Sequence, residues 1–368
     1  MKAAHLLRVP DDGLARKATL AAAAALGESF IDASSNDYLG LAAGFVSRET
    51  SAAGAGASRL IHGTAPEHQA LERELAAWVS TPSALLFSSA YAANLGLVSA
   101  LGTAGTVIIS DASNHASLID GARLAKAQVV VVPHLDLDAI DNALGAHRSA
   151  RACWVLVESY FSMDGDGPDL SRLRTICDAQ DACLVVDEAH ALGVFGPRGA
   201  GRCAEHGVRP DILIGALGKA VGSHGGFVAG STALRSYLWN RARSFVFSTA
   251  PSPRLAALSL EQVRGAQEAD EARKRLLNNA AALREKLLGA GLEVARNSFG
   301  PIVSIVLGDN ERVLAAAANL RAAGILVQAI RAPTVALGAA RLRLTVKSTF
   351  ELEDVKRLAS AVEAACRA

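Results

Sequence analysis

An aspartate, a histidine and a lysine that follow two predicted strands are the residues of this chain best suited to chemistry. The apolar run 183–186 ends at Asp187, and His190 stands three positions further on. A second apolar run, 212–214, leads through a short glycine-containing segment to Lys219. A lysine amine can form a Schiff base with an aldehyde, and a carboxylate can keep a pyridine nitrogen protonated so that the ring accepts electrons. These residues therefore predict a site for pyridoxal phosphate (PLP).

Polar clusters follow three further predicted strands, each at the point where its strand ends. Because ligands of open α/β sheets bind at the carboxyl ends of the strands, we expect all five clusters to form one site. The clusters after the strands at 84–87, 107–109 and 154–157 contain, in that order, Ala90 with Tyr91, His115, and Glu158 with Ser162.

Each predicted role has a simpler alternative. Ala90 and Tyr91 open a predicted helix, whose free N–H groups and dipole could hold a phosphate, but ordinary strand–helix turns look the same. His115 could stack on the pyridine ring or could be a hydrogen-bonded loop histidine. Asp187 could instead cap a helix, although an acid that ends a fully apolar strand favours cofactor binding. Lys219 has small neighbours on both sides, which a lysine beneath a planar ring requires and a surface lysine does not.

The alternation of short apolar runs with helical patterns predicts an α/β fold with a mostly parallel sheet and helices on both faces. The first clear helix follows Pro66, with Leu71 and Leu75 on its apolar face and Glu72 away from that face. Beyond Pro253, a helical stretch over 255–288 precedes a short α+β region with strands near 303–306 and 341–346. We expect an N-terminal segment (1–37), a large domain (38–259) and a small C-terminal domain (260–368). Strands of the large domain are expected at 84–87, 107–109, 129–132, 154–157, 184–186, 212–214 and 227–228.

The composition indicates a packed protein without a polyanionic partner. The chain has 368 residues, 51% of them hydrophobic and 20% charged, which excludes a disordered chain and favours two domains. A formal net charge of +1 gives no general attraction to nucleic acid or to an anionic membrane. The apolar run 18–26 is well below the roughly 18 residues of a membrane helix and lacks the pattern of a signal peptide. We therefore expect a soluble cytoplasmic protein.

Other classes of site are not supported by the motifs. The five cysteines form no CxxC pair, which speaks against a disulfide framework or a zinc ribbon and favours a reducing compartment. His62 and His68 are not set in an HExxH pattern, so no metal is expected. Gly54 and Gly56 lack the third glycine and the preceding strand of a dinucleotide-binding motif.

Six motifs together resemble the α-oxoamine synthases, PLP enzymes of the aspartate-aminotransferase fold (fold type I), and the resemblance covers nearly the whole chain. This family joins an amino acid to an acyl thioester with loss of the amino acid's carboxylate. The resemblance therefore implies a PLP-dependent acyltransferase that works as a homodimer with its active site at the subunit interface. The motifs lie at 35–40, 54–59, 114–117, 161–166, 187–190 and 218–220.

Within the family, the segments 306–310, 329–335 and 341–345 are most similar to members that condense L-alanine with a pimeloyl thioester. This similarity implies L-alanine and pimeloyl-CoA or pimeloyl-acyl carrier protein as partners. One alternative is a member that uses glycine or serine and another acyl group. Another is a non-catalytic partner subunit, although such subunits typically lack the Schiff-base lysine and Lys219 is present here.

The resemblance also implies a role for each matching residue. Lys219 would hold PLP and then act as the base on the α-carbon, Asp187 would pair with the pyridinium nitrogen, and His190 would bond the phenolic oxygen. His115 would stack over the ring and border the substrate. The remaining roles are contact with PLP (Ser162), the backbone phosphate cradle (Ala90 and Tyr91), contact with the phosphate from the other subunit (Ser248 and Thr249), and contact with the substrate (Asn36, Thr334 and Arg16, with Arg8 as an alternative for the distal carboxylate).

Two departures from the family pattern concern the phosphate. Ala216 stands where most relatives have a threonine that contacts it, so one hydroxyl contact worth about 0.5–1.5 kcal/mol is missing. We therefore expect weaker retention of PLP. Ala90 replaces the usual glycine of the phosphate cradle.

Overall fold

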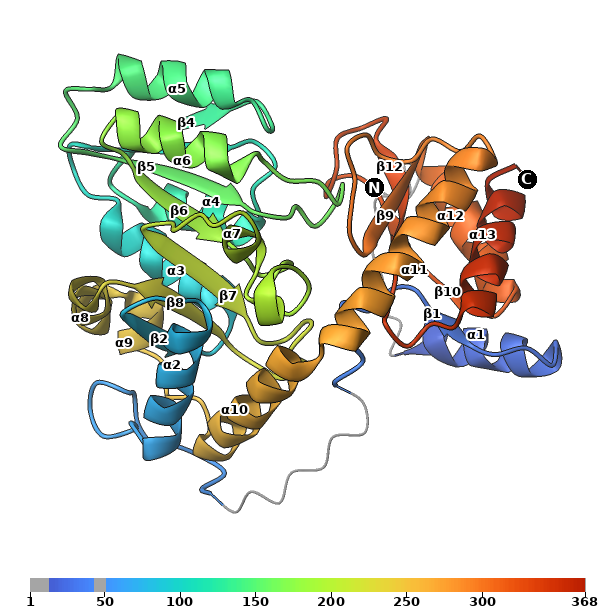
Figure 1. Ribbon diagram of the computed structural model, residues 1–368, viewed down its shortest axis with the longest axis horizontal. Coiled ribbons are helices and arrows are strands. Elements are labelled where there is room, and N and C mark those ends of the chain that lie inside the picture. Colours follow the sequence, from blue (N-terminus) through green and yellow to red (C-terminus); the bar gives the residue numbers. More distant parts are fainter. Residues whose placement is uncertain (1–12, 43–50, 368) are drawn as a thin grey trace. The chain divides into compact units, whose positions relative to one another are not determined.

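The computed structural model describes residues 13–42 and 51–367, which form two compact units (Figure 1). The larger unit comprises 39–42, 51–161 and 167–270, and the smaller unit comprises 13–38, 162–166 and 271–367. These limits differ from the expected domains at three places, the first being that residues 13–38 are part of the smaller unit. Helix α10 (Pro253–Glu268) belongs to the larger unit because it packs on α2 (Pro66–Trp78). Residues 162–166 belong to the smaller unit, where the N–H of Phe299 donates to the carbonyl oxygen of Gly165 over 2.7 Å.

Within the described residues, the larger unit contains one seven-stranded, mostly parallel sheet. All its strands except β8 run in the same direction, since β8 is antiparallel to both of its neighbours. The mostly parallel α/β fold predicted from the sequence is confirmed. Across the sheet, the strands are β2 (Ser83–Phe87), β8 (Gly226–Gly230), β7 (Ile212–Ala216), β6 (Cys183–Asp187), β5 (Ala152–Glu158), β3 (Thr106–Asp111) and β4 (Gln128–Val132).

Side chains of the central strands alternate between two hydrophobic cores, one on each face of the sheet. In β5, Val155 and Val157 point into the core covered by α5 (Leu137–Ala146) and α6 (Leu170–Ala179). Leu156 points into the opposite core, with residues of α3 (Ala90–Leu101) and α4 (Ala116–Leu124). Both helices are labelled in Figure 1. Because both faces are covered, the strands are continuous apolar runs, and this made them easy to locate in the sequence.

Nearly all predicted strands fall inside observed strands, and the main differences concern helices. The stretch 255–288 is two helices, α10 and α11 (Asp270–Gly289), with a break at Ala269. Helix α1 (Leu14–Ala25) was not expected. It is rich in alanine, which favours helix strongly but supplies little hydrophobic contrast, and only Thr19 and Ala23 are buried. The remaining helices of the larger unit are α7 (Arg202–Glu205), α8 (Thr232–Arg241) and α9 (Arg243–Val246).

The smaller unit contains, in its described part, a three-stranded antiparallel sheet and a short parallel strand pair. The sheet has the order β11 (Gln328–Ile330), β12 (Ala340–Thr345) and β9 (Ile302–Gly308). The pair joins β1 (Ile31–Asp32) to β10 (Ile325–Leu326), and the helices are α1, α11, α12 (Asn310–Ala322) and α13 (Leu352–Arg367).

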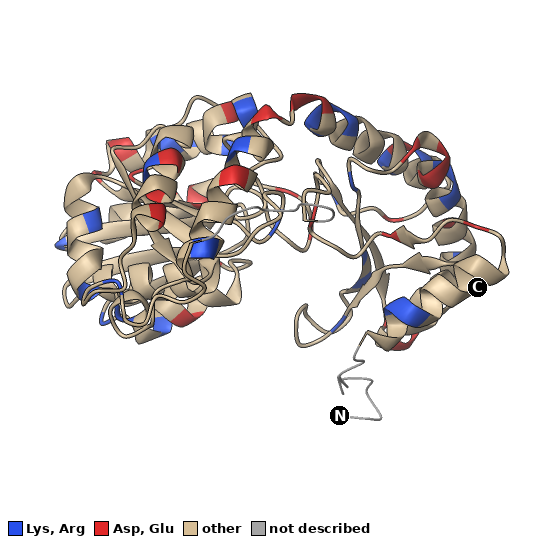
Figure 2. Ribbon diagram, turned by 90° about the horizontal axis from the view of Figure 1, so that it is seen from below, with Lys and Arg blue, Asp and Glu red and all other residues tan. Residues whose placement is uncertain are grey.

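Charged residues of both signs are interspersed along the helices of each unit (Figure 2). This mixture agrees with the formal net charge of +1. Among the residues described, no helix combines the length and the apolar character needed to cross a membrane.

Candidate active site

Three parallel strands bring the principal candidate residues to one edge of the large sheet. The register of β5 and β6 places Glu158 beside Asp187, and the register of β6 and β7 places Asp187 beside Ile214. Strand β7 then leads into the turn that carries Lys219. The expected convergence at the carboxyl edge is therefore present for these clusters.

Asp187 is a buried carboxylate held by two donors. Only 4% of the residue is exposed, and its Oδ1 accepts from the N–H of Ala189 over 2.8 Å. Its Oδ2 accepts from Nδ2 of Asn94 over 2.7 Å. Turns rather than an α-helix follow Asp187, so this residue does not cap a helix. A fixed, buried carboxylate of this kind is suited to pair with a protonated ring nitrogen.

A chain of hydrogen bonds links Asp187 to His115. Nδ2 of Asn94 also donates to Oγ of Ser117 over 2.8 Å, and that oxygen lies 2.8 Å from Nδ1 of His115. The N–H of Ser117 donates to the same Nδ1 over 3.3 Å, so the neutral ring carries its proton on Nε2. Partial desolvation lowers the pKa of His115, with Asp187 opposing and Lys219 reinforcing this shift. His115 is therefore neutral near pH 7, as a ring that stacks on a cofactor should be.

Glu158 is a site residue to which the sequence analysis assigned no role. Its Oε1 accepts from the backbone N–H of His115 over 2.6 Å, which fixes the start of α4. Burial raises the pKa of Glu158 to about 8, and the neighbouring Asp187 carboxylate adds to the shift while Lys219 opposes it. Glu158 is thus largely protonated at neutral pH. The signal that could have identified it is the one that identified Asp187, an acid at the end of an apolar strand.

Lys219 lies in the turn that follows β7 and is half-buried. Its carbonyl oxygen accepts from the N–H of Gly222 over 2.9 Å, which closes the turn. Burial has the largest effect on the pKa of Glu158 and of His115, and the charges of Lys219 and Asp187 also act on both pKa values. The four groups therefore form one electrostatic cluster. Two other predicted residues of this edge are buried, Ala216 as the last residue of β7 and His190 in the turn after β6.

The N-terminus of α3 lies at the end of β2, as predicted for the phosphate cradle. Oγ of Ser89 accepts from the N–H of Ala92 over 3.1 Å, while the first N–H groups, of Ala90 and Tyr91, have no partner within the helix. Strand β8 approaches this terminus so closely that a Cβ on Gly226 would lie 2.3 Å from the nitrogen of Ala90. Tyr91 is 44% exposed, and its ring meets the His115 ring edge-on, with 6.4 Å between the ring centroids.

In the smaller unit, Arg343 brings two predicted residues together. This arginine is 2% exposed, and its Nη2 donates to Oδ1 of Asn36 over 3.0 Å. Its Nε donates to the carbonyl oxygen of Ser162 over 2.6 Å. Arg343 was predicted only as part of the segment 341–345, and Arg341 and Thr345 lie on the same strand, so the sequence pattern alone does not single out Arg343.

The other predicted substrate residues of the smaller unit lie apart from that contact. Arg16 on α1 donates to Oδ2 of Asp32 over 2.7 Å, and its guanidinium lies 4.9 Å from the centroid of the Phe30 ring. Thr334 is exposed on the loop between β11 and β12. Arg8, the alternative for the distal carboxylate, lies outside the described residues.

Ser248 and Thr249 lie in the larger unit, on the segment between α9 and α10. Thr249 forms an isolated antiparallel bridge with Ser58. Thr249 is exposed and Ser248 is half-buried, so both are accessible to a second molecule.

Among all the described residues, no cluster of three or more His, Cys, Asp or Glu side chains could hold a metal ion. The carboxylate, imidazole, amine and helix terminus of the larger unit are the groups that PLP requires.

Comparisons with known proteins show the family to which the chain is related. Residues 28–362 match the family described as aminotransferase class I and II. The 8-amino-7-oxononanoate synthase of Anaeromyxobacter dehalogenans is 42% identical over 347 residues, covering 92% of this chain and 87% of that protein.

Two solved structures have a similar fold. A serine palmitoyltransferase with PLP as its internal aldimine superimposes with a TM-score of 0.87 at 29% identity, covering 93% of this chain and 88% of that one. The 8-amino-7-oxononanoate synthase of Francisella tularensis has a TM-score of 0.78 at 27% identity, with 92% and 98% covered.

Proposed function

This chain belongs to the class I and II aminotransferase family and, within it, to the α-oxoamine synthases, and on that premise we propose that it makes 8-amino-7-oxononanoate in biotin biosynthesis. It is a PLP-dependent acyltransferase. In the proposed reaction, the α-carbon of L-alanine attacks the carbonyl carbon of a pimeloyl thioester, the thiol leaves, and the alanine carboxylate is lost as CO2. The observation that carries the proposal is the 42% identity across 92% of the chain to a protein of that activity.

The cofactor and Lys219 divide the chemistry between them. PLP, when bound, supplies the electron sink that stabilises negative charge at the amino-acid α-carbon. Lys219 would be the residue that holds the cofactor covalently, and its neutral amine would take the α-proton. Asp187, held by Asn94 and Ala189, keeps the ring nitrogen protonated.

The protonation state of Glu158 supports this role of Lys219. Because burial raises the pKa of Glu158 to about 8, the carboxyl group adds no second full negative charge beside Asp187. A second carboxylate would favour the protonated form of the lysine and oppose proton removal from the substrate. Glu158 instead uses its Oε1 to hold the backbone of His115, whose neutral ring borders the substrate in the proposed site.

The finer assignments rest on the resemblance to the family. The enzyme works as a cytoplasmic homodimer in which Ser248 and Thr249 reach the phosphate in the neighbouring subunit. Asn36 and Thr334 contact the substrate, Ser162 contacts PLP, and Arg16 or Arg8 meets the distal carboxylate of the pimeloyl group. The ion pair of Arg16 with Asp32 would have to open for that contact.

A second candidate is a related synthase that uses serine or glycine. The TM-score of 0.87 to a serine palmitoyltransferase favours this candidate on backbone similarity. The sequence identity to that structure is 29%, however, compared with 42% to the Anaeromyxobacter dehalogenans synthase. Thiol release from pimeloyl-CoA by the purified, PLP-loaded protein separates the two when L-alanine, glycine and L-serine are compared. Release that depends on L-alanine is the expected result. Release that depends on serine or glycine instead would contradict the proposed amino acid.

If no amino acid supports release from pimeloyl-CoA, the same comparison is repeated with pimeloyl-acyl carrier protein. Release from that donor with L-alanine would support the reaction and identify the carrier. Failure with both donors would contradict the pimeloyl assignment while leaving the PLP site intact.

A further inference from the structure

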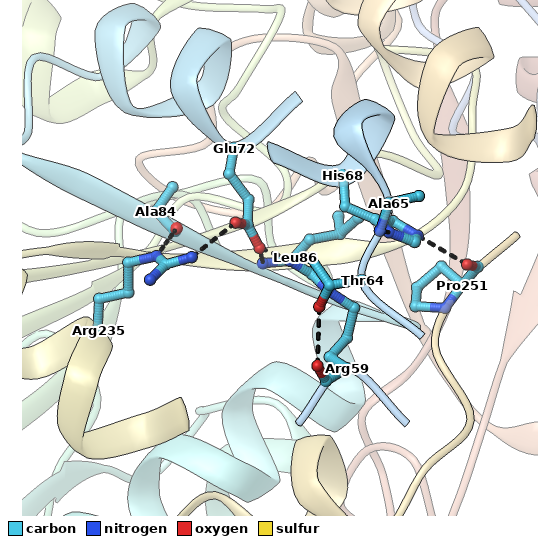
Figure 3. A network of polar contacts seen from close by, with 9 residues as sticks. All are labelled: Arg59, Thr64, Ala65, His68, Glu72, Ala84, Leu86, Arg235 and Pro251. Carbon is cyan, nitrogen blue, oxygen red and sulfur yellow. Dashed lines mark hydrogen bonds and ion pairs between the residues drawn. The ribbon is translucent and has the colours of Figure 1, made fainter. Parts of the chain in front are cut away.

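The larger unit contains a buried carboxylate, that of Glu72, outside the active-site cluster described above. Glu72 on α2 is 4% exposed, although the sequence pattern places it off the apolar face of that helix. Its Oε1 accepts from Nη1 of Arg59 over 3.0 Å and from the N–H of Leu86 over 2.9 Å, and its Oε2 accepts from Nη2 of Arg235 over 3.0 Å (Figure 3). A carboxylate is costly to bury and persists only when paired in this way.

Arg59 is the buried cation that pairs with Glu72. Its side chain is 1% exposed, and Nε donates to Oγ1 of Thr64 over 3.1 Å. The same hydroxyl donates to the carbonyl oxygen of Arg59 over 2.8 Å, which closes the loop that leads into α2 (Figure 3). The loop is tight, because a Cβ on Gly63 would lie 2.0 Å from the carbonyl oxygen of Ala57. The Arg59 guanidinium also lies 5.4 Å from the ring centroid of Trp239. Arg59 therefore fixes the conformation of 57–64.

The loop 57–64 also contacts, through its backbone, the segment that contains Thr249. Ser58, next to Arg59, forms the antiparallel bridge to Thr249, and the N–H of Ala250 donates to the carbonyl oxygen of Ala57 over 3.0 Å. From the other side, Nε2 of the fully buried His68 lies 2.7 Å from the carbonyl oxygen of Pro251 (Figure 3). Nδ1 of His68 accepts from the N–H of Ala65 over 3.0 Å, so the neutral ring donates from Nε2 to Pro251.

We infer that Arg59 and His68, with Glu72 holding Arg59 in place, position Ser248 and Thr249 for the cofactor phosphate of the neighbouring subunit. The inference rests on the proposed function, which assigns Ser248 and Thr249 to that phosphate. Arg59 and His68 are the positioning residues in contact with the two segments, and Glu72 links Arg59 to the helix and to β2. Arg235 holds the opposite oxygen of Glu72 and has no contact with the Thr249 segment among the described interactions.

The two arginines provide a matched pair of variants. Arg59→Met and Arg235→Met each remove one cation from Glu72, but only the first releases the loop next to Thr249. Arg235 is 33% exposed in its side chain and borders a cavity of about 230 Å³, from which water can hydrate Glu72. We expect Arg59→Met to raise the dissociation constant of PLP about tenfold, the scale of one charge-assisted hydrogen bond, and Arg235→Met to change it less than about twofold. Equal changes in both variants, or no change in Arg59→Met, would overturn the inference.

The dissociation constant is measured by titrating the purified dimer with PLP and following the visible absorbance of the bound cofactor, without turnover. Phosphorus NMR of the bound phosphate gives a second readout, and its signal should shift in Arg59→Met but not in Arg235→Met. If Arg59→Met does not fold, the double variant Arg59→Met with Glu72→Gln avoids the unpaired carboxylate. This double variant should melt cooperatively and still bind PLP about tenfold more weakly. Wild-type affinity in a folded double variant would contradict a positioning role.

A second arm separates this inference from the assignment on which it depends. The variant with Ser248→Ala and Thr249→Ala should itself bind PLP more weakly, and adding Arg59→Met should weaken binding little further, because both changes act on the same contact. Additive losses would mean that Arg59 acts elsewhere and would overturn the inference alone. Unchanged affinity in the Ser248→Ala, Thr249→Ala variant would instead refute the assignment of this segment to the phosphate, and the inference with it.

Discussion

Nδ2 of Asn94 donates a hydrogen bond of 2.7 Å to Oδ2 of Asp187, so the carboxylate proposed to meet the pyridinium nitrogen is itself held by a neutral amide. The second proton of the same amide goes to Ser117, and through it the bond network continues to His115. Oδ1 of Asn94 has no hydrogen-bond partner within the described part of the chain. The opposite orientation of the amide would put this oxygen against the carboxylate, so the observed one is required.

Asn94→Ala should therefore weaken PLP binding. A hydrogen bond to a charged group contributes about 1.5–3 kcal/mol, and its loss leaves Asp187 free to turn away from the cofactor nitrogen, so an increase of at least about tenfold in the dissociation constant is expected. Asn240→Ala is the control, because Nδ2 of Asn240 donates to a backbone oxygen on an exposed helix. Titration of both variants with PLP tests this, and equal affinities would show that the Asn94 contact is dispensable.

Glu158→Gln should remove a pH dependence of stability. Burial raises the pKa of Glu158 from an ordinary value of 4.5 to about 8, so folding favours its protonated form. The stability due to this group is fully present below the unfolded pKa and is lost as pH rises through the folded value. Compared with wild type, Glu158→Gln should gain relative stability as pH rises from about 4.5 to about 8. Urea unfolding at several pH values measures this difference, and a difference that stays constant with pH would mean that folding does not shift the pKa of Glu158.

The strands of the large unit could be predicted from the sequence because the sheet is covered on both faces. The run 184–186 contains no polar residue, and the observed β6 extends it by only one residue at each end. An acid after such a run lies at the carboxyl edge of the sheet. Asp187 and the segment leading to Lys219 could therefore be predicted as site residues from the sequence. PLP requires an amine and a carboxylate, and this requirement limited the roles that Lys219 and Asp187 could have.

The contacts that complete the site could not be predicted in the same way. Asn94 and Asp187 are 93 positions apart, and only the order of the strands brings α3 over β6. The pattern on α2 likewise placed Glu72 off its apolar face, but two arginines from distant segments allow the carboxylate to be buried. Periodicity describes the preference of one element and carries no information about the partners that other elements supply.

Lys219→Ala should abolish thiol release and leave the fold intact. The substitution removes the amine proposed to link the cofactor and to take the α-proton, while Asp187, Asn94 and the start of α3, the other groups proposed to bind PLP, remain. Lys356→Ala is the control, because Lys356 is an exposed residue that pairs with Glu353. Loss of activity in both variants would indicate a general defect, and activity retained in Lys219→Ala would refute the assignment of the lysine.

Ala216→Thr should tighten PLP binding. Ala216 ends β7 and is 5% exposed, and a hydroxyl at this position would supply the phosphate contact that the family resemblance implies. One such bond contributes about 0.5–1.5 kcal/mol, which corresponds to a decrease of about two- to tenfold in the dissociation constant. Ala216→Val is the matched control, since valine has the shape of threonine without the hydroxyl. If threonine and valine give the same affinity, the hydroxyl contact is not formed.

His68→Gln should remove a different pH dependence, one on the acid side. Burial lowers the pKa of His68 below its ordinary value of 6.5, and the neighbouring Arg59 cation adds to this shift. Nδ1 already accepts from the N–H of Ala65, so a proton on Nδ1 would break that hydrogen bond. The stability due to the neutral ring is present above the unfolded pKa and is lost as pH falls through the folded value. A glutamine can still accept from Ala65 and donate to Pro251 but does not titrate. Thermal unfolding of both proteins between pH ~5 and ~8 should therefore show wild type losing stability relative to His68→Gln as pH falls below about 6.5. Parallel curves would mean that the ring accepts a proton without breaking its contacts, and His68 would then be a simple spacer between α2 and the Thr249 segment.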